Sequence, residues 1–388
     1  MQLHEAVKKN KLGLNRLLSA IFISILIFSI YNRTLSLGFD IRFLVFPFFI
    51  SSLILAVLVK VKFGDWVVPT RAVLLTLLLT LIVIQDQIAW QFSDLDKDTT
   101  VYKNVIILYI YNFLIAIYFL LNKKYLNDKV LINSVLLSSF FLSLSCLYQA
   151  ITGDLPFVSI GSSGEAFEDK LSLLGVRPSG YAHDPNYTSL LMVFSIYIIV
   201  NIKKTIFNRA LLLVCLLTLF ASGSKTVLLI SALLLIRLMF IKLKIKVIFN
   251  IGFIAFILFG AVIAFSLFEH LSTFSQRLVM WRLALDGFYE RPVLGYGITG
   301  VRSLLELSMR YVQPHNGWLA ILVDHGVVLF TLIISGFTYM LFNTQKRANR
   351  YLIIIFCFLS ISNEMWVYPY WILFLVVPFV YNLGEKRV

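Results

Sequence analysis

The chain has little charge and few of the residues that build disulfides or metal sites. Charged residues make up 14% of its 388 positions, against roughly 25% in soluble domains. Its three cysteines, Cys146, Cys215 and Cys357, lie inside apolar runs without a CxxC pair, so neither a disulfide nor a thiolate site is expected. The sequence also lacks HExxH and an evident pair of glycosidase carboxylates. We therefore predict no metal and no cofactor.

What is abundant is hydrophobic sequence, at 59% of residues with a mean hydropathy of +0.87. Crossing a bilayer takes about 17–25 apolar residues. We predict an all-α polytopic membrane protein, a single integral membrane domain over 1–388, with about twelve spans. The expected spans lie near 17–31, 43–59, 72–91, 104–121, 130–149, 187–202, 208–221, 226–240, 247–268, 318–343, 351–362 and 369–382. The stretches 208–240 and 351–382 each read as two short spans or one long one.

The net charge of +14 falls in short basic clusters between apolar runs. This distribution is typical of the positive-inside rule and does not indicate nucleic-acid binding. It places both termini in the cytoplasm and predicts a multi-pass membrane protein. Eight cations remain in or between two large outer loops, and this excess on the disfavoured side indicates an anionic ligand. They are Lys170, Arg177, Lys225, Arg277, Arg282, Arg291, Arg302 and Arg310.

The two large loops, 150–186 and 269–317, are expected on the outer side, and long polar loops between spans often carry function. We expect each to contain short helices packed against the bundle. In the second, an apolar face recurs with helical spacing from Arg277 to Phe288. Trp281 occupies the i+4 position from Arg277, which leaves this guanidinium available for phosphate.

Two features of this loop have simpler interpretations. Arg282 and Asp286 are four apart, which favours an exposed salt bridge over ligand binding. Gly295, Gly297 and Gly300 spell GxGxxG, but they follow a predicted helix and Pro292 instead of a strand. We therefore reject a dinucleotide site and expect a tight turn that brings the two halves of the loop together.

Histidines near the predicted span ends are candidates for acid–base chemistry. His315 and Asn316 follow Pro314 where a span begins, and a histidine titrating near neutrality suits proton removal from an acceptor hydroxyl. The alternative is an interfacial histidine without chemistry. His183 is the rival candidate, in a segment where Asp184 and Asn186 are expected to cap the next span.

Polar residues within apolar segments have structural interpretations. Asp324 and His325 are costly in a membrane and should face the protein interior, paired with each other or with an outer-loop arginine. The segment Gly223-Ser-Lys225-Thr resembles the end of a phosphate-binding loop, but no strand precedes it, and we reject that interpretation.

Taken together, these motifs resemble the O-antigen ligase and polymerase superfamily of bacterial membrane glycosyltransferases. The resemblance covers roughly 140–345. It rests on the order and placement of Arg177-Pro-Ser-Gly-Tyr-Ala-His-Asp-Pro-Asn186, Ser224-Lys225, Arg277-(x)3-Trp281 with Pro292-Val-Leu-Gly-Tyr-Gly297, and His315-Asn316-(x)9-Gly326. The family often has Ser-Arg at Ser224-Lys225, and Leu329 replaces an expected glycine or small polar residue.

The resemblance implies a metal-independent, inverting transferase of the GT-C type in the bacterial inner membrane, with a cavity facing the periplasm. Its donor would be a glycan on undecaprenyl diphosphate. The two large outer loops, 150–186 and 269–317, would then be periplasmic. By motif, His315 would be the catalytic base, and Arg177 and Arg277 would bind the diphosphate, joined by Arg282 and Lys225. His183, Asn186, Asn316 and Gly326 would support the site.

Three functions are open at this point. An O-antigen polymerase would extend a carrier-linked glycan, and the Asp184-Pro185-Asn186 segment resembles polymerase-type members. An O-antigen ligase would move the glycan onto lipid A core. The implied partners are the carrier-linked glycan, an acceptor glycan or core, membrane lipids and a chain-length regulator. The third alternative, a lipid or polysaccharide transporter or flippase, would place its charges near the bilayer midplane and keep outer loops short.

Overall fold

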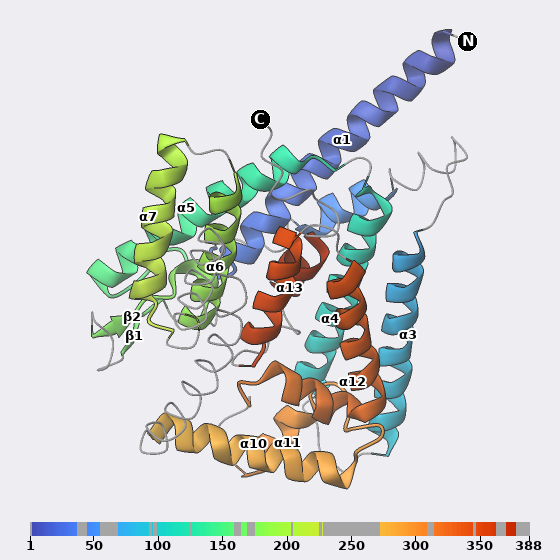
Figure 1. Ribbon diagram of the computed structural model, residues 1–388, viewed down its shortest axis with the longest axis vertical. Coiled ribbons are helices and arrows are strands. Elements are labelled where there is room, and N and C mark those ends of the chain that lie inside the picture. Colours follow the sequence, from blue (N-terminus) through green and yellow to red (C-terminus); the bar gives the residue numbers. More distant parts are fainter. Residues whose placement is uncertain are drawn as a thin grey trace, which may run out of the picture.

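The computed structural model describes 2–36, 45–54, 69–92, 95, 99–123, 126–158, 164–168, 175–202, 205–224, 227, 272–308, 314–343, 347–361 and 370–377. These residues form a mostly helical protein (Figure 1). The predicted span at 247–268 lies outside the described residues, as does the span at 226–240 apart from Val227, and the span at 369–382 is described over 370–377.

Helices of membrane-crossing length and hydropathy confirm the polytopic class. Four described helices qualify: α3 (Thr70–Gln91), α4 (Thr99–Leu121), α5 (Asp128–Thr152) and α12 (Gly317–Asn343). Shorter apolar helices occur at Arg16–Tyr31 within α1 (Gln2–Tyr31), at Val45–Ile54, in α6 (Pro185–Asn201) and in α7 (Ile206–Ala221). The helix α13 (Arg347–Leu359) and the π-helical turn η3 (Ile372–Val376) follow α12. The total of about twelve spans remains a prediction.

The centre of the bundle is held by small polar residues as well as by apolar packing. The Tyr31 hydroxyl lies 2.8 Å from Ser195 Oγ, and Ser139 donates to the same oxygen at 2.6 Å. These contacts join α1, α5 and α6. Small hydroxyl side chains allow close approach of membrane helices and bond between them, which explains the buried serines in an otherwise apolar core.

The first outer loop differs from the expectation of short helices alone. It contains the two-stranded antiparallel sheet of β1 (Phe167–Glu168) and β2 (Val176–Arg177), in which Phe167 pairs with Arg177. Only the 3-10 turn η2 (Gly180–Ala182) is helical among its described residues. Pro178 accounts for part of this, because the residue before a proline is pushed into extended conformation. Arg177 therefore ends a strand instead of lying on a helix.

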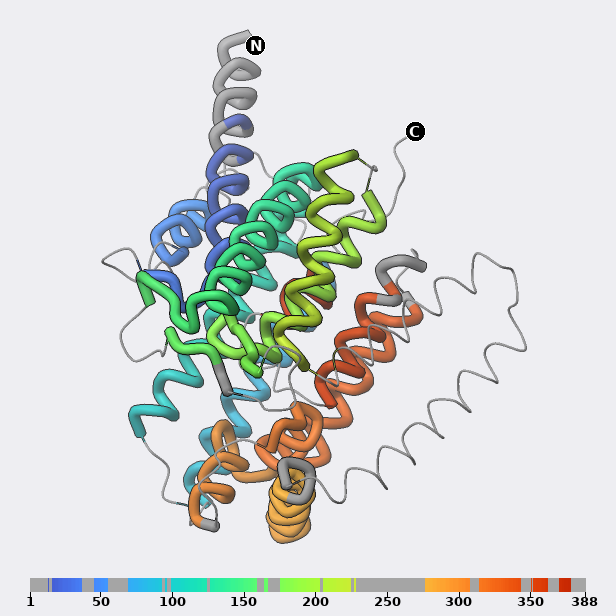
Figure 2. Tube along the Cα trace, turned by 90° about the vertical axis from the view of Figure 1, so that its left-hand side faces the viewer, coloured from blue at the N-terminus to red at the C-terminus, as the bar shows by residue number. Residues whose placement is uncertain are grey.

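The second outer loop contains the expected helices, α10 (Ser272–Glu290) and α11 (Gly300–Ser308). The predicted helix over 277–288 is thus confirmed. In Figure 1, α10 lies across one end of the bundle, roughly perpendicular to α3, and Figure 2 shows it end-on at the same extremity. Described residues of this loop pack on α12 and form a small core of their own around Met280, Leu305 and Val323.

The predicted span at 318–343 is not a continuous helix. Gly326 has φ 67° and ψ 178° within α12, so two helical segments meet at a break. We predicted one span there although Asp324 and His325 directly precede the break, and the reason for the break lies in the contacts of the second loop.

Candidate active site

The break in α12 is paired with the glycine-rich segment between α10 and α11. The N–H of Tyr296 donates to the Val323 carbonyl at 3.1 Å, and the N–H of Gly297 donates to Asp324 O at 2.7 Å. On the other side of the break, Val327 N donates to Pro292 O at 2.8 Å. The loop therefore supplies partners for backbone groups that the interrupted helix leaves free.

The glycines permit this close approach of two backbones. A Cβ on Gly295 would lie 2.5 Å from the Val323 carbonyl oxygen, and one on Gly326 would lie 2.2 Å from Val293 O. Both residues have positive φ, 66° and 67°, which favours glycine. The expected tight turn is present, and its partner is the broken helix.

Two buried polar residues of α3 also bind the glycine-rich segment between α10 and α11. Asp86 accepts a bond from Ile298 N at 2.6 Å and another from the Tyr102 hydroxyl. The Gln85 side-chain amide donates to Leu294 O and to Asp324 O, the latter at 3.3 Å. Our sequence interpretation missed both residues. The sequence did contain a signal for them, because two polar side chains lie inside the apolar run 72–91. Burying such side chains in a membrane costs free energy unless they are hydrogen-bonded.

Asp324 and His325 face the interior as predicted, with 9% and 2% of their surfaces exposed. Asp324 Oδ1 accepts from Val301 N at 2.7 Å, at the start of α11. His325 Nδ1 lies 3.0 Å from Gln85 Oε1. These partners are different from the ones that we expected, and they make both residues part of the connection among α3, α11 and α12.

His315 is positioned by contacts on both sides of it in the chain. The Trp281 indole N–H donates to the Pro314 carbonyl at 2.7 Å, which attaches α10 to the residue before His315. After it, Asn316 Oδ1 accepts from Leu319 N at 3.1 Å and caps α12. His315 itself has φ 50°, a conformation that is uncommon outside glycine and is found more often at functional sites.

Arg177 connects the first outer loop to two helix ends. Its Nε donates to Ser222 O at 2.9 Å, at the end of α7, and its Nη2 donates to Asn186 Oδ1 at 3.1 Å, at the start of α6. Asp184 caps α6, as predicted, by accepting from Asn186 N at 2.7 Å. Asn186 does not share that capping role through its side chain, because its amide oxygen receives Arg177.

The base of this loop is fixed by Gln149, a fully buried residue of α5. Its Oε1 accepts from Ser179 N at 2.8 Å and from Gly180 N at 2.9 Å, while its Nε2 donates to Gly164 O at 2.6 Å. Gly180 has φ 53°, and a Cβ there would lie 2.6 Å from Cys146 Sγ. The segment that carries Arg177 and Asp184 is therefore anchored to the bundle.

Electrostatics shows that the two outer loops converge on His315. Burial lowers the pKa of His315 below its usual 6.5, the positive charge of Arg277 lowers it further, and Asp184 opposes the shift. Burial also lowers the pKa of Arg277, with an added contribution from the charge of Arg177 and an opposing one from Asp184. His315 thus lies within the field of the Arg277 guanidinium and the Asp184 carboxylate, and Arg277 lies in turn within the field of Arg177.

The other predicted site residues have different positions. Arg282 is exposed, and five residues place it about 140° around α10 from Arg277. Among the described residues, Arg282 forms no ion pair with Asp286, and an i,i+4 ion pair of this loop lies instead on α11, between Arg302 and Glu306 at 2.9 Å. His183 is exposed with φ 83°, and Lys225 lies outside the described residues. The roles of Arg282, His183 and Lys225 in binding remain predictions.

The arrangement combines the groups needed to move a proton and hold an anion. Neutral His315 can accept a proton, because its lowered pKa keeps the imidazole uncharged near neutral pH. Arg277 presents positive charge close to it and Arg177 presents positive charge near Arg277, in a partly buried setting where such charge acts strongly on a bound anion. The fold and the charges together define a polytopic helical membrane protein with a cationic site at one end of its bundle.

A comparison with known protein families narrows this class of membrane protein. Residues 210–334 match the family described as O-antigen ligase, which supports the resemblance to the O-antigen ligase and polymerase superfamily and a membrane function of that type. The match contains Arg277, His315 and the broken part of α12, while Arg177 and Asp184 lie before it. A search of curated proteins gave no match.

Proposed function

We propose that the chain is a metal-independent, inverting glycosyltransferase that uses a glycan on undecaprenyl diphosphate at the periplasmic face, and that it is an O-antigen polymerase. The observation that carries this proposal is the meeting of His315, Arg277, Arg177 and Asp184 from two separate outer loops. The family match supports lipid-linked glycan chemistry in a membrane.

In the proposed step, His315 removes the proton from an acceptor hydroxyl. The hydroxyl oxygen then forms a bond to the anomeric carbon of the donor sugar. The bond between this carbon and the diphosphate oxygen breaks, and its electron pair leaves with the lipid diphosphate. Direct attack from the opposite side inverts the anomeric centre.

Arg277 and Arg177 would stabilise the departing diphosphate. The guanidinium group presents a planar fork of donors that matches phosphate oxygens. Arg177 is already held by Ser222 and Asn186, so its charge is positioned before a ligand arrives. Because these cations supply the charge that the leaving group needs, we expect transfer to continue in EDTA, and dependence on added Mg²⁺ or Mn²⁺ would contradict this part of the proposal.

The choice between polymerase and ligase rests on the first loop. Asp184-Pro185-Asn186 resembles polymerase-type members, and here Asp184 lies in the field of His315 while Asn186 binds Arg177. A ligase that transfers the finished glycan to lipid A core is the second candidate. It is favoured by the description of the matching family, O-antigen ligase.

The test is a gel of lipopolysaccharide from a strain in which the gene is deleted, with glycan on the carrier measured in parallel. A core bearing a single repeat unit would support the polymerase. Bare core with long chains retained on the carrier would support the ligase. Unchanged lipopolysaccharide and unchanged carrier glycan would contradict both, and accumulation at the cytoplasmic face would favour a transporter or flippase.

A further inference from the structure

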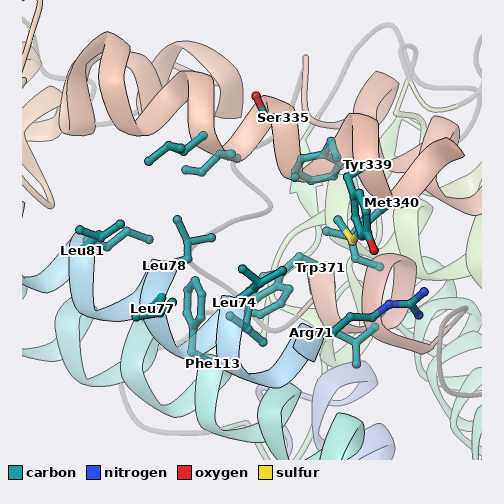
Figure 3. Close-up of a pocket in the computed structure, with 18 of the residues that line it drawn as sticks. Arg71, Leu74, Leu77, Leu78, Leu81, Phe113, Ser335, Tyr339, Met340 and Trp371 are labelled. Atoms are coloured by element: carbon teal, nitrogen blue, oxygen red, sulfur yellow. The ribbon is translucent and has the colours of Figure 1, made fainter. Parts of the chain in front are cut away.

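A cavity of about 530 Å³ lies between α3 and α12, away from the cationic site. Figure 3 shows leucines of α3 facing α12 across it, with Phe113 of α4 and Trp371 contributing to the wall. Its size falls within the usual range for ligand sites, about 300–1,000 Å³. The lining is apolar along most of its length, so its occupant must be largely hydrocarbon.

The cavity opens on the lipid-facing surface of the helical bundle. Leu74, Leu77 and Tyr339 line it and yet keep about half of their surfaces exposed, at 53%, 54% and 50%. Apolar side chains that are exposed on membrane helices meet lipid. The opening therefore faces acyl chains of the bilayer.

The leucines that line the cavity extend over the first half of α3. From Arg71 to Leu81 the helix rises by about 15 Å, which equals about half of the 30 Å hydrocarbon thickness of a bilayer. The cavity thus has the depth of one leaflet. Its inner end reaches Ile82 and His325, next to Gln85, whose side chain helps to hold the segment 292–300 at the other end of α3.

The end of the cavity nearest the membrane surface carries a positive charge. Figure 3 shows the Arg71 guanidinium beside Tyr339 and Met340, at the end away from Leu81. Arg71 lies in the first turn of α3, at the positive end of the helix dipole, which adds to the attraction for anions. Basic pockets between membrane helices on the cytoplasmic side bind anionic lipid headgroups.

We propose that this cavity binds one acyl chain of an anionic glycerophospholipid from the leaflet on the Arg71 side, with the lipid phosphate at Arg71. An apolar slot one leaflet deep with a cation at its surface end complements this amphiphile in both shape and charge. The carrier lipid of the glycan donor fits less well, because its diphosphate is proposed at His315 and Arg277, beyond the opposite end of α3.

The experiment measures lipid retained by the full chain. Protein is extracted from membranes in mild detergent, and the copurifying phospholipid and polyprenyl phosphate are quantified by mass spectrometry. We expect anionic phospholipid to be retained in stoichiometric amount. Arg71→Gln should lower its affinity about fivefold or more, while Arg209→Gln, which removes an exposed cation at the start of α7, should leave it unchanged.

A second variant fills the cavity without relying on the charge. Gly336 lines the cavity, and a Cβ there would meet nothing within 4 Å, so Gly336→Phe should displace the lipid while the backbone is kept. Equal retention by wild type, Arg71→Gln and Gly336→Phe would overturn the proposal. Retention of polyprenyl phosphate in place of phospholipid would also overturn it. Neither readout depends on glycan transfer.

Discussion

Trp281 donates its indole N–H to the carbonyl oxygen of Pro314 at 2.7 Å. This bond connects the helix that carries Arg277 to the residue just before His315. Arg277 is one helical turn before Trp281, so the arginine and the indole share a face of α10. Two motifs that are more than thirty residues apart thereby form one site, which explains why Arg277 lowers the pKa of His315.

The proposed contact of Arg277 with phosphate predicts that lysine cannot replace this arginine. Arg277→Lys keeps the charge but loses the two-pronged contact with phosphate, so we expect the rate of transfer to fall about 100-fold or more. The control is Arg302→Lys on α11, an exposed arginine paired with Glu306, which should transfer normally. Initial rates with purified lipid-linked donor measure both, and equal rates for the two variants would exclude a phosphate-binding role for Arg277.

The charges near His315 predict how the pH dependence of transfer changes when Asp184 is replaced. Asp184 raises the pKa of His315 against the lowering by burial and Arg277, so Asp184→Asn should lower it further. Because the base must be neutral, the acid limb of kcat/KM should move to lower pH. Asparagine also caps helices well, which protects α6. Asp286→Asn, at an exposed position on α10, is the matched control, and a shift to higher pH in Asp184→Asn would contradict the account.

The break in α12 predicts opposite results at two glycines of one helix. Gly326→Ala places a Cβ against the Val293 carbonyl at positive φ and should destabilise the protein by about 2 kcal/mol or more. Gly336→Ala meets nothing within 4 Å and should keep or raise the melting temperature. Thermal unfolding in detergent measures both. Equal melting temperatures would show that the pairing of the loop with the break is unimportant.

The buried contact between Asp86 and Tyr102 predicts energetic coupling. Asp86→Asn and Tyr102→Phe each remove part of the polar cluster that holds Ile298 N. We expect their destabilising effects to be non-additive, with a coupling of about 0.5–3 kcal/mol. A double-mutant cycle of unfolding free energies tests this. Additive effects would mean that the two side chains act independently.

The sequence predicted well those features that depend on local pattern. Hydropathy located the apolar helices, the spacing around Trp281 predicted α10, and the position of Asp184 predicted a cap. The order of the motifs also indicated a family resemblance that the match over 210–334 supports, while the roles of Arg277 and His315 stay predictions. These features follow from residue types close together in the chain.

The parts that could not be predicted depend on contacts between distant segments. The break at Gly326 is stabilised by backbone groups of 292–297. These groups are distant in the chain, so the hydropathy of 318–343 alone predicts one continuous span. Likewise, Gln85 and Asp86 are explained only by the loop that they bind more than 200 positions later. The strand that ends at Arg177 pairs with Phe167, and such short pairing has little sequence pattern.

The central claim is that His315 is the base of a glycosyl transfer. The most direct measurement is release of polyprenyl diphosphate from lipid-linked glycan by purified wild type and His315→Asn, with acceptor present. Asparagine tolerates the left-handed backbone at φ 50°, so the variant should fold normally while losing the basic nitrogen. We predict a rate about 100- to 10,000-fold lower, in protein of unchanged melting temperature. A near-normal rate in well-folded His315→Asn would contradict the account.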